Sequence, residues 1–205
     1  MSDANPPEKP ATPPHAAAKP APKPAATDAS GHPWVESIRS SVPDAVLAAK
    51  EFARQITVTV APGKIRDVAR HLKEKEDFRY CVDVTAIDWK TREPRYDVVY
   101  HFYSFSKNDR IRVKCGVAAG QDVPSIANVF LAANWSERET WDMFGIRFEG
   151  HPDLRRILTW EGFHGHPLQK DFPLEGVDTG AAIYPEEWPE GGGPAPDDSN
   201  RKVVS

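Results

Sequence analysis

Three carboxylates close together in the chain, Glu137, Glu139 and Asp142, are the first candidates for chemistry. Paired acids can act as general acid and general base. The spacing of Ser136 and Glu139, however, is that of a capping box, and acids in a first turn interact favourably with the helix dipole. Arg138 and the pair at 155–156 offer these acids ion-pair partners. We therefore interpret the cluster as helix capping and ion pairing, with acid–base catalysis as the alternative.

Three histidines, His151, His164 and His166, are candidate metal ligands on a Gly-rich stretch. A catalytic zinc site needs three protein ligands, but this spacing fits no standard motif. We expect His151 and His166 to hold two Gly-His-Pro turns through their ring nitrogens. A small His-dependent metalloenzyme built on these three residues is the alternative from another class.

Cofactor-binding signatures are few. The two cysteines, Cys81 and Cys115, have no CxxC spacing and are too few for a four-Cys iron–sulfur site, so we expect them to be buried in strands. The chain contains no G-x-G-x-x-G after an expected strand and no G-x-x-x-x-G-K-[ST]. A net charge of -4 gives no general reason to expect nucleic-acid binding. No run approaches the ~18 apolar residues of a membrane span.

The hydrophobic pattern predicts an α+β fold. Helices are expected over residues 34–39, 64–75, 125–132 and from Ser136 to Gly145, and strands over residues 46–54, 56–60, 80–89, 96–105 and 110–118. In the strand at 80–89 the alternation predicts that Tyr80, Val82, Val84 and Ala86 share one face. This order predicts a two-layer sandwich of helices on a mixed, largely antiparallel sheet.

The composition divides the chain into four parts. Residues 1–31 are rich in Pro and Ala and predict a disordered arm. Residues 32–148 form the α+β domain, residues 149–185 an extended docking segment, and residues 186–205 a loose C-terminal tail. The arm lacks the apolar core of a secretory signal and the Arg-rich character of a transit peptide. We therefore expect a bacterial protein that is not exported.

The stretch from Ser136 to Gly176 is the most unusual part of the chain. Beyond its first ten residues it has no helical or strand period, and Gly or Pro recurs every few residues. Such a segment must lie over its own domain or over a partner. Arg155 and Arg156, together with seven nearby aromatic residues, favour a protein interface. In the isolated chain we expect both guanidinium groups to be exposed.

The same stretch resembles a known family. The matching residues are 137–139 (ERE), 141–146 (WDMFGI), 150–158 (GHPDLRRIL), 165–168 (GHPL) and 170–173 (KDFP). Together they closely resemble the 30 kDa subunit of respiratory complex I, which in bacteria is the C subunit of NADH-quinone oxidoreductase. Gln169 and residues 159–161 depart from the family pattern.

The resemblance implies a non-catalytic subunit of the peripheral arm, at the cytoplasmic face of the bacterial inner membrane. FMN, iron–sulfur clusters and NADH would be held by partner subunits and none by this chain. The implied partners are the 49 kDa quinone-site homologue and the iron–sulfur connecting subunits, with no nucleic acid. A related membrane-bound hydrogenase, a dehydrogenase with another donor, or a free-standing adaptor are the alternatives. The implied interface residues are Glu137, Arg138, Glu139, Asp142, His151, Arg155, Arg156, His166, Lys170 and Asp171.

Overall fold

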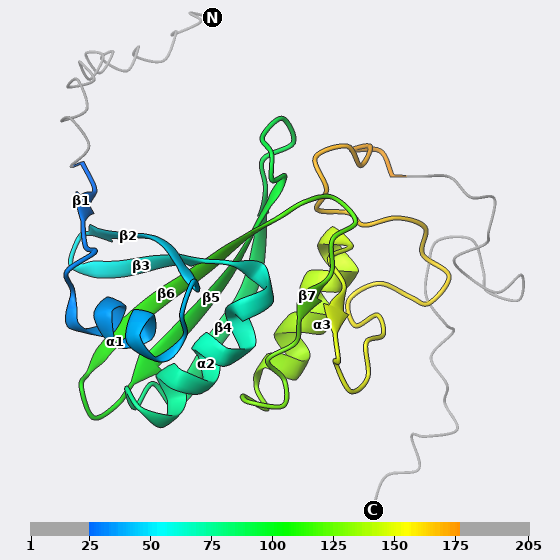
Figure 1. Ribbon diagram of the computed structural model, residues 1–205. Helices are drawn as coiled ribbons and strands as arrows, with labels where there is room; N and C mark the ends of the chain where they lie inside the picture. Colours follow the sequence, from blue (N-terminus) through cyan, green and yellow to red (C-terminus); the bar gives the residue numbers. More distant parts are fainter. Residues whose placement is uncertain (1–24, 177–205) are drawn as a thin grey trace, which may run out of the picture.

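The computed structural model describes residues 25–176 of the 205-residue chain (Figure 1). The expectations for the first 24 residues, for 177–185 of the docking segment and for the tail at 186–205 lie outside the described residues. Three helices and eight strands follow one another in the order β1, α1, β2, β3, α2, β4, β5, β6, β7, α3 and β8 within the described part.

Six strands form one mixed sheet in the order β1-β2-β3-β6-β5-β4. Their bounds are β1 Thr27–Asp28, β2 Val46–Phe52, β3 Gln55–Val60, β4 Tyr80–Asp88, β5 Tyr96–Ser104 and β6 Asp109–Val117. Neighbouring strands are antiparallel except β3 and β6, which run parallel. A second, short parallel ladder joins β7 (Val123–Pro124) to β8 (Phe148–Glu149). The predicted mixed, largely antiparallel sheet is confirmed.

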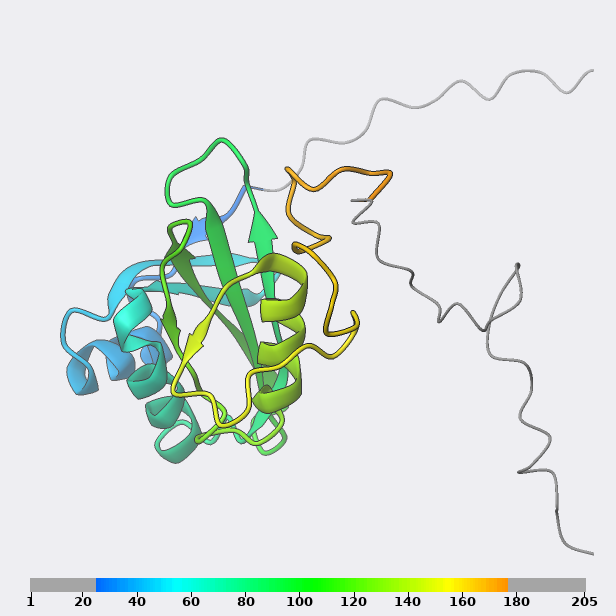
Figure 2. The same cartoon turned by 90° about the vertical axis from the view of Figure 1, so that its right-hand side faces the viewer.

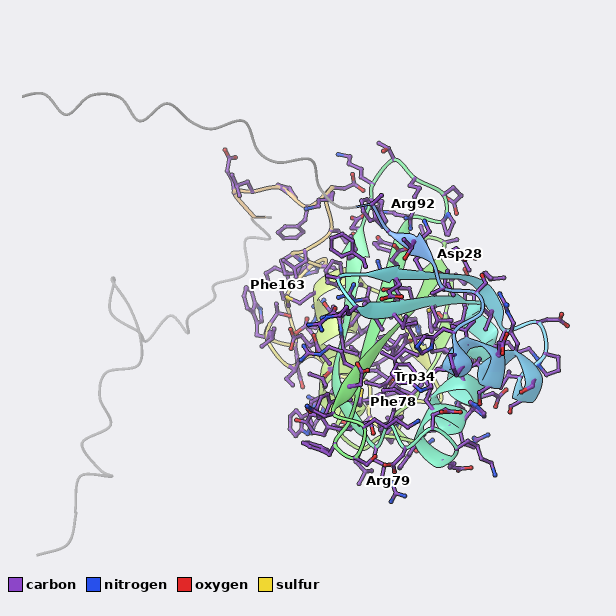
Figure 3. The ribbon with its side chains drawn as sticks, turned by 90° about the vertical axis from the view of Figure 1, so that its left-hand side faces the viewer. Asp28, Trp34, Phe78, Arg79, Arg92 and Phe163 are labelled. Carbon is purple, nitrogen blue, oxygen red and sulfur yellow. The ribbon has the colours of Figure 1, made fainter. Side chains whose placement is uncertain are left out.

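The helices α1 (Pro33–Ser41) and α2 (Ile65–Glu74) cover one face of this sheet (Figure 1). In α2 the apolar residues recur at helical spacing, and all four are fully buried: Ile65, Val68, Ala69 and Leu72. The start of α1 is fixed by an edge-on contact between Trp34 and Phe78, whose ring centroids lie 4.9 Å apart (Figure 3). Hydrophobic burial on one helix stripe and one sheet face therefore builds the core.

The third helix, α3 (Ala133–Phe144), packs along the edge strand β4 and carries the C-terminal segment on its outer side (Figure 2). Thr140 Oγ1 donates to the backbone oxygen of Val84 at 2.9 Å, which satisfies an acceptor on the free edge of the sheet. Met143 and Phe144 join the same core as the other two helices. The two-layer α+β sandwich is thus confirmed.

Two expectations about helices are wrong. Residues 125–132 form turns rather than a helix, and α3 begins at Ala133, with Ala132 as an N-cap that makes no side-chain bond. Ser136 and Glu139 therefore both lie inside the helix, where they are i,i+3 neighbours and do not form a capping box at its start. Glu139 is exposed on the helix surface. The predicted end of the helix is correct, because Gly145 takes a left-handed conformation with φ 78°.

The expected face of β4 is also partly wrong. Val84 and Ala86 share the buried face, but Tyr80 and Val82 are 47% and 52% exposed and do not lie on it. The pairing of β4 with β5 shifts register between Cys81 and Asp83, and this irregularity reverses the alternation. Cys81 points into the core in their place, and both cysteines are buried as expected.

The sheet includes residues that precede the expected boundary at residue 32. Thr27 and Asp28 form β1 and pair with Glu51 and Lys50 of β2. Ala29 is buried against the core. Residues 27–29 therefore belong to the sheet and not to the expected arm, because the edge of β2 offers them unpaired backbone groups.

Candidate functional site

The carboxylate of Asp142, near the end of α3, organises the start of the C-terminal segment. Its Oδ2 accepts three successive backbone N–H groups, from Ile157, Leu158 and Thr159, at 2.9–3.1 Å. Its Oδ1 accepts from Thr159 Oγ1 and from Arg156 Nη1, each at 2.5 Å. Burial alone would raise the pKa of Asp142, but the bonds from Thr159, Ile157 and Leu158 hold it well below its usual value. The site is a charged carboxylate in a nest of donors.

Arg156 completes this site from the other side. Its side chain is only 13% exposed, and Nη2 donates to the carbonyl oxygens of Phe163 and Gly165 at 2.8 and 3.1 Å. The guanidinium also lies 5.7 Å from the ring centroids of Trp141 and Phe163. One arginine thus ties two turns of the segment to α3. The expectation that Arg156 is exposed in the isolated chain is wrong, because its partners are supplied by the same chain.

Arg138 and His151 hold the segment nearer its beginning. Arg138 donates from Nε and Nη2 to the backbone oxygens of Arg155 and Arg156 at 3.1 and 3.0 Å. His151 accepts from the N–H of Asp153 through Nδ1 and donates from Nε2 to the oxygen of Asn134. Burial lowers the pKa of His151, so the ring is held neutral. The expected turn-holding role of His151 is confirmed.

The segment also caps the C-terminal end of α3. The last carbonyl groups of a helix have no partner within the helix. Here His166 Nδ1 donates to the oxygen of Asp142, the N–H of Leu168 to that of Met143, and Gln169 Nε2 to that of Phe144, at 2.9, 3.0 and 2.7 Å. Three otherwise orphaned acceptors are therefore satisfied by residues 166–169.

A second carboxylate, Asp88 at the end of β4, anchors the far end of the segment. Arg95 binds it through Nε and Nη2 at 2.9 and 2.7 Å, and the N–H of Lys170 donates to its Oδ2 at 2.8 Å. Asp171 reaches the same Arg95 at 2.7 Å and Lys90 at 3.2 Å. The hydrogen bond from Arg95 outweighs burial and holds the pKa of Asp88 well below its usual value.

Glu137 has a different environment from Asp142. It is fully buried, and it accepts from Ser125 Oγ at 2.5 Å and from the N–H of Ile126 at 2.7 Å. Burial raises its pKa to about 7. The carboxylate therefore stabilises the turn that precedes α3 rather than the first turn of its own helix. The expected ion pairs of this cluster form at Asp142 only, since Glu137 is held by a hydroxyl and an amide.

The ten predicted interface residues fall into three groups. Five of them make buried or half-buried contacts within the chain: Glu137, Arg138, Asp142, His151 and Arg156. His166 caps α3, and Lys170 and Asp171 lie at the Asp88 anchor with their side chains toward solvent. Glu139 and Arg155 are exposed, and among residues 25–176 Arg155 pairs only with its neighbour Asp153. The structure therefore brings the first group together around α3 and leaves the last two outside.

Four residues that hold the segment were not predicted: Asp88, Arg95, Thr159 and Gln169. For Asp88 a signal existed, since the alternation that buries Ala86 also buries Asp88, and a buried carboxylate needs a partner. Thr159 and Gln169 gave no such signal, because their contacts depend on the path of a segment without a period. His151, His164 and His166 do not converge, and residues 25–176 contain no group of three His, Cys, Asp or Glu able to hold a metal ion.

The outer surface of the segment carries several large apolar side chains. Leu158, Trp160 and Leu168 are 62%, 47% and 51% exposed. Phe163 stacks on Phe172 with 5.8 Å between ring centroids, and these rings with Pro167, Leu168 and Pro173 line a shallow groove. Buried polar bonds thus fix the segment from inside, while large apolar side chains lie exposed on its outside among charged ones, which marks a candidate interaction surface.

The fold and this segment define a class of protein: a small α+β domain that presents a firmly tethered, non-repetitive segment to its surroundings. Residues 58–178 match the profile of the family "Respiratory-chain NADH dehydrogenase, 30 Kd subunit". The chain belongs to this family, as the resemblance implied.

Individual relatives agree with the family assignment. The chain is 52% identical over 136 residues to the C subunit of NADH-quinone oxidoreductase from Rhodobacter capsulatus, covering 65% of this chain and 68% of that one. It is 47% identical over 135 residues to the same protein from Geobacter sulfurreducens, covering 65% and 83%. Its fold is similar to a chain of the archaeal membrane-bound sulfane sulfur reductase, a respiratory membrane complex. That similarity has a TM-score of 0.60 at 27% identity and covers 71% of this chain and 86% of the other.

Among the helices of residues 25–176, none is long and apolar enough to cross a membrane.

Proposed function

We propose that this chain is a structural, non-catalytic subunit of the peripheral arm of complex I, the NADH:quinone oxidoreductase that passes electrons from NADH through FMN and iron–sulfur clusters to quinone. Its partners are the 49 kDa quinone-site homologue and the iron–sulfur connecting subunits. Through them it associates with the cytoplasmic face of the inner membrane. FMN, clusters and NADH are held by those partners. Family membership and the relatives from NADH-quinone oxidoreductases support this proposal.

One observation carries the proposed role. Residues 150–176 have no helix or strand, yet two buried carboxylates, Asp142 and Asp88, fix their path. A segment ordered in advance loses little conformational entropy when it binds, and this strengthens association. Its exposed leucines and aromatic rings are the side chains that gain most from burial against another protein. The buried members of the predicted interface shape this surface, and the exposed ones, Glu139 and Arg155, contribute at its rim.

The proposal predicts that assembly depends on apolar side chains that the monomer does not need. The double variant Leu158→Ser with Leu168→Ser should fold normally, since both leucines are mostly exposed. Burying a leucine contributes ~1.5–3 kcal/mol, so loss of both should weaken association at least about 30-fold. The readouts are the thermal midpoint of the purified chain and its recovery with partner subunits from membranes of the native host.

Leu47→Ser is the matched control, because Leu47 is 64% exposed on β2, far from the segment in the sheet order. Wild-type recovery of the double variant would refute docking through this surface. The co-purified complex also distinguishes the alternatives. NADH oxidation coupled to quinone reduction supports complex I, and a complex that uses another donor supports a relative of the hydrogenase or sulfur-reductase type. Stoichiometric iron or zinc on the purified chain would support the metalloenzyme alternative.

A further inference from the structure

The central sheet has one face without a helix. Side chains of β3, β5 and β6 that point toward α1 and α2 belong to the core, for example Val58, Tyr100 and Val113. Their neighbours along each strand point the other way, and all three helices of the described residues lie on the core side or at the edge strand β4 (Figures 1 and 2). We call this second side the open face.

The open face carries a row of basic side chains along its central strand. In β6, Arg110, Arg112 and Lys114 alternate with the buried residues Ile111, Val113 and Cys115. The neighbouring strands place His101 opposite Arg112, and Thr57 of β3 beside the same arginine. Lys50 of β2 pairs with Thr57, so it lies in the same transverse row. We call Lys50, His101, Arg110, Arg112 and Lys114 the basic stripe.

The basic stripe is not neutralised within the described part of the chain. Among residues 25–176, none of its lysines or arginines has a carboxylate oxygen within 4.0 Å, and Arg112 donates only to the amide oxygen of Gln55 at 3.3 Å. Asp83 is the acid opposite His101 across the β4–β5 pair. Positive charge thus gathers here in a chain whose net charge is -4.

The sequence beyond Gly176 contains the carboxylates that would neutralise the basic stripe. Residues 177–205 contain six carboxylate side chains against two basic ones, Arg201 and Lys202; the six are Asp178, Glu186, Glu187, Glu190, Asp197 and Asp198. We propose that this acidic C-terminal segment docks on the open face of its own sheet and pairs with the basic stripe. The inference does not depend on the proposed function.

The path of the described chain makes this docking possible. Asp171 is tied to Arg95, one residue before Tyr96, and Tyr96 pairs with Val117 at the end of β6. Lys114 lies three residues from that end, and the stripe from Lys114 to Arg110 spans only ~13 Å at strand geometry. Ten extended residues beyond Gly176 reach ~33–36 Å, so residues 186–187 can lie over the stripe.

The other end of the chain is a poorer occupant. Residues 1–24 contain three lysines, Lys9, Lys19 and Lys23, against Asp3 and Glu8. Like charges would repel this segment from the stripe. Residues 177–205 also have the higher effective concentration of a tethered ligand, which favours them over an acidic segment of a separate molecule.

His101 provides the probe for this proposal. Burial lowers its pKa, Arg112, Lys114 and Arg110 lower it further, and Asp83 raises it. Docked carboxylates would favour the charged ring. We compare the full chain with a variant in which all six acids are replaced: Asp178→Asn, Glu186→Gln, Glu187→Gln, Glu190→Gln, Asp197→Asn and Asp198→Asn. We expect NMR titration to place the His101 pKa about 0.3–1 units higher in the full chain at low salt, with the difference lost near ~0.5 M NaCl.

Zero-length carbodiimide cross-linking locates the contact. The full chain should yield amide links from the tail carboxylates to Lys50 and Lys114, within single molecules. Lys64 and Lys75 are the matched controls, because both are exposed beside α2 on the helix side and have no carboxylate within 4.0 Å among the described residues. Equal His101 titrations in the two proteins, equal links to the control lysines, or links found only between molecules would each overturn the proposal.

Discussion

Arg156 has the sequence features of an interface residue, but in the structure it anchors the C-terminal segment through its ion pair with Asp142. The sequence favours a protein interface for Arg155 and Arg156 and also offers them as ion-pair partners of the acids at 137–142. In the structure the carboxylate partner of Arg156 is Asp142, fourteen positions earlier in the same chain. Asp142 also accepts three amide N–H groups and a hydroxyl. A buried charge needs this many bonds to offset its lost hydration. Arg155 next to it remains exposed, so adjacent arginines have opposite roles.

The structure predicts that Arg156→Ala and Arg155→Ala differ sharply in the isolated chain. Loss of a buried ion-pair partner costs ~3–5 kcal/mol, and Asp142 keeps four other donors, so Arg156→Ala should cost on the order of 3 kcal/mol in the stability of the segment. Arg155 is 65% exposed and pairs with Asp153. Its removal should cost roughly 0–1 kcal/mol. Hydrogen exchange at the amides of Leu158 and Thr159, which donate to Asp142, is the measurement.

Arg155→Ala serves as the control within this experiment, since it removes the same side chain one position away. Faster exchange in Arg156→Ala alone is expected. Equal protection in both variants would show that the amide bonds to Asp142 do not need the guanidinium, and the anchoring role of Arg156 would then be wrong.

At the scale of the element, the end of α3 is where helix and segment meet. Gly145 leaves the helix with φ 78°, and a Cβ built there would lie 2.7 Å from His166 Cδ2. The same His166 caps the carbonyl group of Asp142. Glycine is therefore needed at this position for two reasons, the left-handed backbone and the close approach of the capping ring.

A comparison of Gly145→Ala with Gly120→Ala separates the cost of the left-handed backbone from the cost of the close contact with His166. Gly120 has nearly the same φ of 77°, but a Cβ there would meet nothing within 4 Å. Gly120→Ala should cost about 1–2 kcal/mol from the backbone alone. Gly145→Ala should cost ~1–3 kcal/mol more, because His166 must move away from the helix end. Denaturant unfolding of both variants measures the difference in the free energy of unfolding. Equal losses in the two variants would mean that the His166 ring moves aside without destabilising the protein.

The elements with a clear hydrophobic period could be predicted from the sequence, and those fixed by single contacts could not. The face of α2 and the inward residues of β6 follow from spacing alone. The shift at Cys81 and Asp83, which turns Tyr80 outward, depends on pairing with β5. The role of Glu137 was not predictable, because it binds Ser125 across the turn that precedes α3, a contact that no local pattern encodes.

The candidate site likewise has features that could be predicted from the sequence and features that could not. The motif at 150–158 lies in the segment that Asp142 and Asp88 tether, and the Gly-His-Pro sequence at 150–152 predicted the turn-holding role of His151. The direction in which each charged side chain points was not predictable, because the segment has no period to define an inner and an outer face. The assignment of residues 149–185 as a docking segment stays a prediction, to be tested by the leucine variants.

At the scale of the whole molecule, the described part of the chain joins the sheet from its first few residues onward. β1 pairs with the edge of β2, Ala29 is buried, and Arg39 Nη1 donates to the oxygen of Ser30 at 3.1 Å. Such edge pairing protects β2 from pairing with other chains. Residues 1–24 are rich in Pro and Ala, a composition that cannot bury much apolar surface.

Two truncations test where the folded domain begins. A chain that starts at residue 25 keeps β1 and should melt within about 1 °C of the full chain, because the removed residues have no apolar run. A chain that starts at residue 31 loses the backbone pairing of Thr27 and Asp28 and the burial of Ala29. These losses together amount to ~1–3 kcal/mol, or roughly 3–10 °C in the melting temperature of a domain of this size. Calorimetry of the three proteins at equal concentration is the measurement. Equal melting of all three would show that β1 contributes nothing to stability, and a large loss on removal of residues 1–24 alone would show that this part of the chain packs on the domain.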